Sequence, residues 1–172
     1  MTKETIYDGK VVRVSKLEGR WEIVEHAPAV AVLALREVEG QLEVLLVLQN
    51  RPAVGQKTWE LPAGLVDEGE IPAAAAAREL AEEVGLGGTL TLIAQVFSSP
   101  GFTDEKVYVF EATELFDHKL PGDEDDDFEF SWKPLAPTWR EIAGGAVPSS
   151  APTLFGLTYA LGKRGGLPGL NP

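Results

Sequence analysis

The sequence predicts an α+β fold in which helices cover a mixed β-sheet. Two apolar runs rich in β-branched residues, 30–36 and 42–48, flank a turn and have the composition of buried central strands. One helix is expected in the middle of the chain, over residues 72–84, and two more near its end, over 137–144 and 153–161. Because strands lie on both sides of the central helix in the sequence, the helices are expected to pack on the faces of one sheet.

The other expected strands are short and are bounded by turn residues. Residues 11–17 and 20–26 should form an N-terminal antiparallel hairpin around Glu18-Gly19. Further strands are predicted at 58–61, 89–97, 105–112 and 128–132. No internal repeat or linker divides the 172 residues, which are most simply one domain with a full core.

The composition excludes several classes of protein. The chain has no cysteine, which excludes disulfides and thiol nucleophiles and fits a reducing cytoplasm. No run approaches the roughly 20 apolar residues that span a bilayer, and the first residues lack the apolar core of a signal peptide. A cytoplasmic protein without a membrane partner is therefore expected. The net charge of −12 argues against a nucleic-acid partner, because such binding needs a basic surface.

The segment 64–86 carries the strongest chemical signal. Glu79 and Glu83 are four residues apart, so on a helix they lie on one face, with Glu82 beside them. Two carboxylates about 4 Å apart repel each other by about 4 kcal/mol at an effective dielectric of about 20. A divalent cation relieves this repulsion, and hard oxygen ligands suit Mg²⁺ or Mn²⁺. The alternative is an amphipathic helix whose acidic face is only solvated.

The residues around these glutamates fit a loop followed by a helix. Gly64 permits a turn before the helix, and Gly85 is placed as its C-terminal cap. Arg78 precedes Glu82 by one turn and is positioned to reach back to Glu70, which would hold the carboxylates in place. The helix should bury a stripe of mostly small apolar residues, namely Ala73, Ala76, Ala77, Leu80 and Val84.

The segment resembles the Nudix box, GX5EX7REUXEEXGU with U an aliphatic residue, at every fixed position. The resemblance implies Mg²⁺- or Mn²⁺-dependent hydrolysis of a nucleoside diphosphate linked to another moiety. It implies the α/β/α sandwich of that family over residues 28–162, with a dimer-forming hairpin at 1–27 and a flexible tail at 163–172. Glu79 and Glu83 would be the principal metal ligands, with Glu82 assisting and Glu70 completing the cluster.

A second motif narrows the substrate class. Pro100 lies at the distance beyond the box that marks ADP-ribose pyrophosphatases within the family, and the run PGFTDE around it resembles theirs. The resemblance implies that ADP-ribose is cleaved to AMP and ribose 5-phosphate. It assigns Arg51 to a phosphate and the carbonyl of Ala63 to a metal, and it places three residues along the terminal ribose, namely Ser99, Gly101 and Glu105.

Several alternatives to this assignment remain open. Pro100 alone could be an ordinary loop proline. The substrate could be another nucleoside diphosphate sugar, a dinucleoside polyphosphate or an oxidised nucleoside triphosphate. A different class is a catalytically silent domain that binds ADP-ribose as a signal, although the complete set of box glutamates disfavours it.

The N-terminal hairpin implies a homodimer by the same resemblance, because the related enzymes exchange this hairpin across a two-fold axis. Arg20 and Glu22 match nucleotide-contacting positions, and Lys10 and Val11 would come from the partner chain. Lys10 stands where the resemblance leads us to expect arginine, so a bidentate phosphate contact is not expected there. The alternative is that Arg20 and Glu22 are the solvated face of an edge strand.

An acidic loop at residues 122–127 offers a candidate general base. The family places a mobile catalytic glutamate in this region, which makes Glu124 or Asp126 the candidate. The alternative is a solvated run of like charges. His26 and His118 have no partner at metal-ligand spacing, so structural or surface roles are expected for both.

Overall fold

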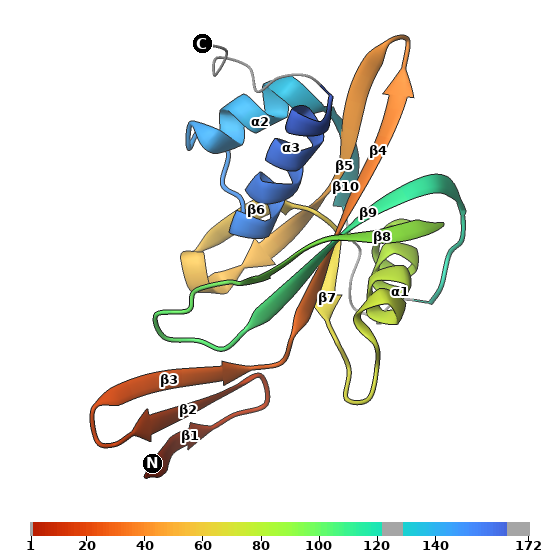
Figure 1. Ribbon diagram of the computed structural model, residues 1–172. Coiled ribbons are helices and arrows are strands. Elements are labelled where there is room, and N and C mark those ends of the chain that lie inside the picture. Colours follow the sequence, from red (N-terminus) through yellow and green to blue (C-terminus); the bar gives the residue numbers. More distant parts are fainter. Residues whose placement is uncertain (1, 122–128, 165–172) are drawn as a thin grey trace.

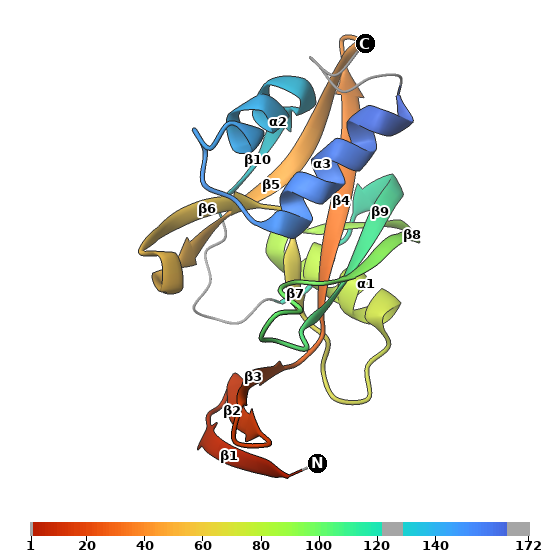
Figure 2. The ribbon, with the colours of Figure 1, turned by 60° about the vertical axis from the view of Figure 1, so that its left-hand side comes forward.

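The computed structural model describes residues 2–121 and 129–164. A mixed β-sheet with helices on both faces forms the body of the molecule, and a small second sheet projects from it (Figure 1 and Figure 2). Helix α1 (Pro72–Val84) lies on one face, and α2 (Leu135–Ala143) and α3 (Ala151–Lys163) lie on the other. The expected α+β fold with an α/β/α sandwich is therefore confirmed.

The main sheet is built around two long antiparallel strands, β4 (Ala29–Val38) and β5 (Gln41–Arg51). Strand β4 also pairs in parallel with β9 (Lys106–Asp117), which makes the sheet mixed. The strand order is β10-β5-β4-β9-β8, with β8 at Leu86–Phe97 and β10 at Glu129–Pro134. Two short strands add to the central pair: β6 (Gln56–Glu60) pairs with β5, and β7 (Ala63–Leu65) pairs with β4. A single 3₁₀ turn (Pro52–Val54) joins β5 to β6.

The N-terminal hairpin is present and gains a third strand. Strands β2 (Val12–Leu17) and β3 (Trp21–His26) pair around a tight turn that contains Glu18 and Gly19. The φ angles of these two residues, 52° and 65°, lie in the left-handed region that type I′ turns require. Strand β1 (Lys3–Asp8) pairs with β2. Strand β1 was not predicted, because all six of its residues are exposed and no apolar alternation marks it.

The helix ends follow from local chemistry. Helix α1 starts at Pro72, where a missing N–H leaves no hydrogen bond unmade, and ends before Gly85, which has a φ of 69°. Helix α3 starts after Ser150, whose side-chain oxygen accepts a hydrogen bond from the N–H of Thr153. These starts and ends fix where α1 and α3 approach the sheet.

The predicted buried stripe of α1 was wrong in part. Ala73 and Ala77 are exposed, and the buried face instead includes Ala75, Ala81 and Glu83. The helix is rotated from the predicted orientation, so that the carboxylate of Glu83 faces strands β5 and β7, where polar groups bind it. The buried face of α1 thus includes a hydrogen-bonded carboxylate, which the apolar periodicity of the sequence does not predict.

Two apolar layers form the core, one on each face of the sheet. The layer under α1 joins alanines and leucines of that helix to alternate residues of β4 and β5, such as Val30 and Val47. The layer under α2 and α3 uses the opposite set, including Leu33, Leu46 and Leu157. Within the described ranges, no helix is both long and apolar enough to cross a bilayer.

The projecting sheet joins the body at a loop that the sequence analysis marked as functional. The N–H of Val24 in β3 donates a hydrogen bond to the carbonyl of Phe102 at 2.7 Å. The N–H of His26 donates to the carboxylate of Asp104 at 3.0 Å. The N-terminal sheet therefore holds the loop between β8 and β9 in place.

Candidate active site

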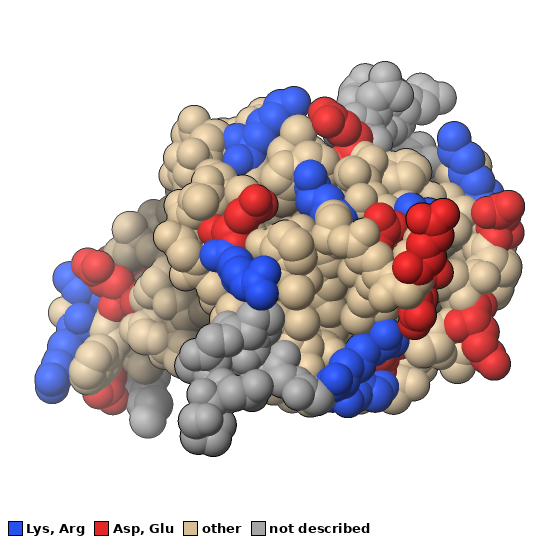
Figure 3. Space-filling view, turned by 90° about the horizontal axis from the view of Figure 1, so that it is seen from above, with Lys and Arg blue, Asp and Glu red and all other residues tan. Residues whose placement is uncertain are grey.

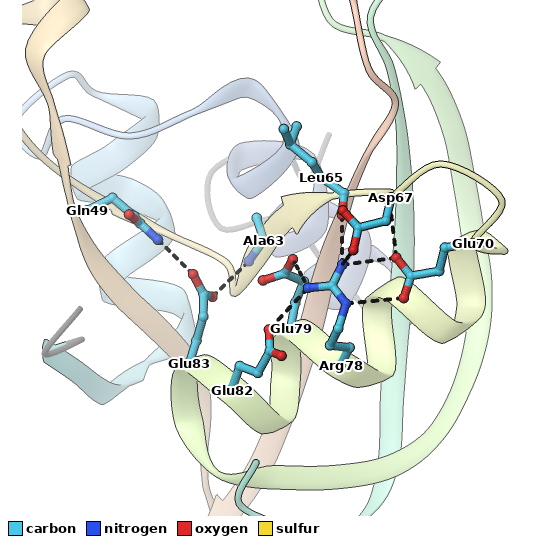
Figure 4. A network of polar contacts seen from close by, with 9 residues as sticks. All are labelled: Gln49, Ala63, Leu65, Asp67, Glu70, Arg78, Glu79, Glu82 and Glu83. Carbon is cyan, nitrogen blue, oxygen red and sulfur yellow. Dashed lines mark hydrogen bonds and ion pairs between the residues drawn. The ribbon is translucent and has the colours of Figure 1, made fainter. Parts of the chain in front are cut away.

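Arg78 gathers three of the four box glutamates around one guanidinium group (Figure 4). Its Nε and Nη2 atoms donate to the two oxygens of Glu70 at 3.1 and 3.0 Å, and Nη1 donates to Glu79 at 2.7 Å and to Glu82 at 3.1 Å. Nη2 also donates to the carbonyl of Leu65. The hydrogen bonds to Glu70, followed by those to Glu79 and Glu82, hold the pKa of Arg78 far above its usual range. The expected contacts of Arg78 with Glu70 and Glu82 are thus present.

Glu83 lies apart from this group and is bound by neutral donors (Figure 4). One of its oxygens accepts from Nε2 of Gln49 at 2.9 Å, and the other accepts from the N–H of Ala63 at 3.0 Å. The side chain is buried, with 6% of the residue exposed. Burial raises the pKa of Glu83 to about 8, because the charged form loses its hydration.

Glu79 packs directly against the backbone of Gly64. A Cβ atom at position 64 would lie 2.1 Å from the carboxyl carbon of Glu79, so only glycine leaves room for this side chain. Burial raises the pKa of Glu79, and the hydrogen bond from Arg78 only partly opposes this shift. The box therefore places the partly buried carboxylate of Glu79 and the buried carboxylate of Glu83 against the short strand β7.

The backbone of Ala63 faces the same carboxylates. The carbonyl of Pro62 accepts from the N–H of Val32, and the N–H of Val66 donates to the carbonyl of Pro28. Hydrogen-bonded residues alternate along an antiparallel pair, so the N–H and C=O groups of Ala63 both point away from β4. Its N–H already donates to Glu83, and its carbonyl oxygen lies along the same edge. This edge therefore offers an oxygen ligand beside the buried carboxylates.

These residues suit a hard divalent cation. Buried carboxylates with raised pKa values and a neighbouring backbone carbonyl are the donors that Mg²⁺ and Mn²⁺ bind. Among the residues that the structure describes, no three acidic or histidine side chains converge on one point as they stand. Arg78 binds oxygens of Glu70, Glu79 and Glu82, while Glu83 has other partners.

A cavity of about 630 Å³ lies next to β7. Its walls come from β4, β6, the 3₁₀ turn after β5, the start of α3 and the loop before β9. Ala63 and Gly64 line it as well as touching the carboxylates of α1. Strand β7 therefore borders both the acidic cluster and the cavity.

Arg51 brings a positive charge to this cavity. Its Nε and Nη2 atoms donate to both oxygens of the buried Glu60, at 2.9 and 3.0 Å. This hydrogen-bonded pairing raises the pKa of Arg51, and the charges of Glu83 and Glu105 add to the effect. Arg51 therefore lies within electrostatic reach of the acidic cluster and of the opposite cavity wall.

The loop between β8 and β9 contributes only part of its predicted residues to the cavity. Ser98 and Glu105 line it, whereas Ser99 and Gly101 do not. The carbonyl of Ser99 instead accepts hydrogen bonds from the N–H groups of Phe102 and Thr103, which closes the turn that contains Pro100. Glu105 faces His26, with 3.4 Å between a carboxylate oxygen and Nδ1.

The N-terminal residues divide in the same way. Val11 lines the cavity of its own chain, although the resemblance assigned it to a partner's pocket. Arg20 and Glu22 are exposed near the turn between β2 and β3 and do not line the cavity, and the Arg20 guanidinium lies 4.5 Å from the centre of the Trp21 ring. Lys10 is also exposed and outside the lining. Within one described chain, these three residues stay away from the cavity.

Three residues at this site were not found from the sequence. Gln49 binds Glu83, Glu60 binds Arg51, and His26 lines the cavity, although we expected a structural or surface role for that histidine. Strand alternation was a usable signal for Gln49, because residues two apart on a strand share a face and Gln49 precedes Arg51 by two. The candidate bases Glu124 and Asp126 lie outside the described residues.

Charged side chains of both signs share the face of the molecule in Figure 3, where basic and acidic side chains are interspersed with neutral residues.

Comparison with known proteins identifies the family. The family model for the NUDIX domain matches residues 25–147. An ADP-ribose pyrophosphatase of Mycobacterium tuberculosis is 35% identical over 162 residues, covering 87% of this chain and 77% of its own length. An ADP-ribose pyrophosphatase of Bacillus subtilis is 41% identical over 140 residues, covering 75% of this chain and 74% of its own.

A solved structure of an ADP compounds hydrolase has the same fold. It matches with a TM-score of 0.70 and 23% identity, covering 96% of this chain and 94% of the other. At this identity the likeness concerns the fold alone. The complete box, the match of the domain family and the identity to these relatives agree, and the chain belongs to the Nudix family of pyrophosphohydrolases.

Proposed function

We propose that this Nudix protein hydrolyses ADP-ribose to AMP and ribose 5-phosphate with Mg²⁺ or Mn²⁺. The observation that carries the proposal is the meeting of two sites at β7. The carboxylates of Glu79 and Glu83 contact this strand, and the same strand lines the cavity that Arg51 also lines. The names of the two bacterial relatives support ADP-ribose as the substrate.

The metal would be held by Glu79, Glu83 and the carbonyl of Ala63, with Glu82 and Glu70 nearby. When bound, such a metal polarises a water molecule and neutralises the charge of the diphosphate. Gln49 and the N–H of Ala63 fix the plane of the Glu83 carboxylate, as outer partners of metal ligands commonly do. Arg78 keeps Glu79 and Glu82 together against their mutual repulsion.

The diphosphate would bind beside Arg51, whose guanidinium would donate hydrogen bonds to phosphate oxygens. The guanidinium would also stabilise the negative charge that develops as the bond between phosphorus and the bridging oxygen breaks. Glu105, which lines the cavity opposite His26, would accept hydrogen bonds from the terminal ribose. Ser99, Gly101 and Pro100 would act through the shape of their loop. Glu82, or Glu124 or Asp126 in the acidic loop, would orient or deprotonate the attacking water.

The active protein would be a homodimer built with the N-terminal sheet, residues 1–27. That sheet projects from the body (Figure 2) and exposes large apolar side chains, including Ile6, Tyr7 and Trp21. Exposed apolar side chains in a cluster commonly mark an interface. Arg20 and Glu22, which do not reach the cavity of their own chain, would then lie near the nucleotide bound by the second copy. Light scattering that finds only monomer at micromolar concentration would contradict this dimer.

Release of AMP from ADP-ribose tests the activity directly. A panel of other nucleoside diphosphate sugars, diadenosine polyphosphates and 8-oxo-dGTP should give lower kcat/KM values with either metal. Preference for one of the latter two would overturn the choice of substrate. Tight ADP-ribose binding without AMP release would instead indicate a sensor. Reaction in ¹⁸O-labelled water identifies the phosphorus that is attacked.

The variant Glu83→Gln tests the metal assignment. It should lower kcat by orders of magnitude, because an amide is a poor ligand for a hard cation. Its folding should be retained, because the amide oxygen at position 83 can accept from the N–H of Ala63, while the Gln49 amide can turn its own oxygen toward the new NH₂ group. Near-normal turnover would refute the assignment.

A further inference from the structure

Glu60 is a buried carboxylate in the cavity wall whose role the metal chemistry leaves unexplained. It is 6% exposed, lies on β6 and lines the cavity beside Arg51. Each of its oxygens accepts one hydrogen bond from the Arg51 guanidinium, and one of them also accepts from the hydroxyl of Thr58. A carboxylate is seldom buried unless it is paired in this way.

We propose that Glu60 is a positioning residue that holds the Arg51 guanidinium in the orientation that binds the diphosphate. The inference rests on the proposed function, because it assigns Arg51 to the phosphates. Glu60 itself would not touch the substrate. It acts through the two parallel hydrogen bonds to Arg51, a geometry that fixes both the position and the plane of a guanidinium.

The support for Glu60 is itself rigid, since β6 is fastened to the segment that leads into α3. The N–H of Trp59 donates to the carbonyl of Pro148, the hydroxyl of Ser149 donates to the carbonyl of Trp59, and the N–H of Leu61 donates to the hydroxyl of Thr153. Burial alone would raise the pKa of Glu60, but hydrogen bonds from Arg51 and Thr58 hold that pKa below its usual range. The carboxylate therefore stays charged and in place.

Glu60 occupies only one edge of the Arg51 guanidinium, and the other N–H groups remain for a ligand. Nε and one N–H of Nη2 face Glu60, and within the part of the chain that the structure describes no other acceptor takes a hydrogen bond from Arg51. The Arg51 side chain is 45% exposed. The N–H groups on its remaining edge are thus available to phosphate oxygens in the cavity.

Without this pairing, other carboxylates would compete for Arg51. The charges of Glu83 and Glu105 both act on the guanidinium. A guanidinium released from Glu60 would turn toward one of them, away from the orientation set by β6. An arginine in an acidic cavity needs a fixed partner if it is to remain available to the substrate.

Orientation and charge give opposite expectations for Glu60. If the carboxylate mattered only as a negative charge, its removal would strengthen the binding of an anionic substrate. If it positions Arg51, its removal weakens that binding, because a mobile guanidinium loses its fixed hydrogen-bond geometry. The two roles therefore differ in the sign of the effect.

The test uses isothermal titration calorimetry with the α,β-methylene analogue of ADP-ribose in Mg²⁺ buffer, and steady-state kinetics with ADP-ribose. Glu60→Gln should weaken binding by about 10- to 100-fold, the usual range for lost charge-assisted hydrogen bonds. The KM should rise by a similar factor, with a smaller change in kcat. Glu60→Asp keeps the charge but is too short to bind both nitrogens, and it should show the same weakening. Equal or tighter binding in either variant overturns the proposal.

A double-mutant cycle asks whether Glu60 acts through Arg51. The double variant Arg51→Ala/Glu60→Gln should bind no more weakly than Arg51→Ala alone. The matched control is Glu43→Gln, which removes a similar carboxylate from an ion pair with Arg36 across β4 and β5, outside the cavity lining. This control should stay within about twofold of the wild type, as for most exposed ion pairs. Additive effects in the cycle would overturn the proposal.

A spectroscopic measurement tests, without any substrate, whether Glu60 holds the Arg51 guanidinium in place. The ¹⁵N–¹H signal of Arg51 Nε should be sharp in the wild type and in Glu43→Gln, and exchange-broadened in Glu60→Gln. An unchanged signal in Glu60→Gln would show that Glu60 does not restrain Arg51. If the wild type binds the analogue but releases no AMP from ADP-ribose, the proposed function fails while the calorimetric cycle still decides about Glu60. If the analogue does not bind at all, the Nε signal decides.

Discussion

Metal binding should release a proton from Glu83, and its affinity should therefore depend on pH. In the metal-free protein, burial raises the pKa of Glu83 to about 8. A metal takes the carboxylate form only, so a protonated Glu83 must lose its proton when the cation enters. Glu79, whose pKa burial also raises, contributes in the same direction.

The size of the effect follows from that pKa. At pH 7, only about one molecule in ten carries an ionised Glu83, and at pH 6 about one in a hundred. The apparent Kd for Mn²⁺ should therefore tighten by about tenfold per pH unit between pH 6 and 7 and level off above 8. Deprotonating a carboxyl group whose pKa is about 8 costs about 1.4 kcal/mol at pH 7, and the metal must offset this cost.

Calorimetric titration with Mn²⁺ at pH 7, in two buffers of different ionisation enthalpy, measures the protons released. About one proton per site is expected from Glu83, and more if Glu79 contributes. The control Glu111→Gln alters a buried carboxylate that pairs with Lys163 and should leave the proton count unchanged. A count of zero, together with a Kd that does not change between pH 6 and 7, would refute the reasoning.

The same pKa predicts how the stability of the metal-free protein depends on pH. The folded state binds the Glu83 proton more tightly than the unfolded state, so this contribution is fully present below the ordinary glutamate pKa of 4.5. It is lost as the pH rises toward 8. The Tm of the metal-free wild type should fall over this window, and the Tm of Glu83→Gln should fall less.

Two glycine substitutions test the packing of the site and of the core. Gly64→Ala places a methyl group 2.1 Å from the carboxyl carbon of Glu79. The variant should keep its fold but bind Mn²⁺ about tenfold or more weakly. An unchanged Mn²⁺ affinity in calorimetry would contradict this expectation. Gly156→Ala, in α3, places a methyl group 2.8 Å from the fully packed Leu61, and denaturant unfolding should show a loss of about 1–3 kcal/mol. Its control is Gly162→Ala in the same helix, where no atom lies within 4 Å, and this change should stabilise the protein by about 0.5–1 kcal/mol. Equal effects of the two helix variants would show that packing against Leu61 does not matter.

The sequence predicted the elements whose signal is local. The apolar runs of β4 and β5 and the capped helix α1 are marked by composition and by end residues, and all three were predicted within a few positions. Strand β7 was missed because three residues after a proline carry too little pattern, and they become a strand only by pairing with β4. Strand β1 is exposed throughout and shows no alternation.

In the candidate site too, contacts between residues close in the sequence were predicted, and contacts between distant elements were not. The contacts of Arg78 with Glu70 and Glu82 follow from helical spacing and a nearby loop, and both were predicted. The contacts of Gln49 with Glu83 and of Glu60 with Arg51 join residues on different elements. The packing of α1 on the sheet brings the first pair together, and the pairing of β5 with β6 brings the second together. Strand alternation places Gln49 on the same face as Arg51, but it does not identify the partner of either residue.

The local charges explain why an acidic protein would need a metal to bind a diphosphate. Arg78 is shared among three carboxylates and Arg51 is paired with Glu60, so neither arginine presents a full positive charge to the cavity. Glu83 and Glu105 add negative charge, on a chain whose net charge is already −12. The arginines therefore supply direction and position rather than attraction. On the proposed function, the attraction for phosphate would come from cations bound by Glu79 and Glu83, so one acidic cluster would control both substrate binding and catalysis.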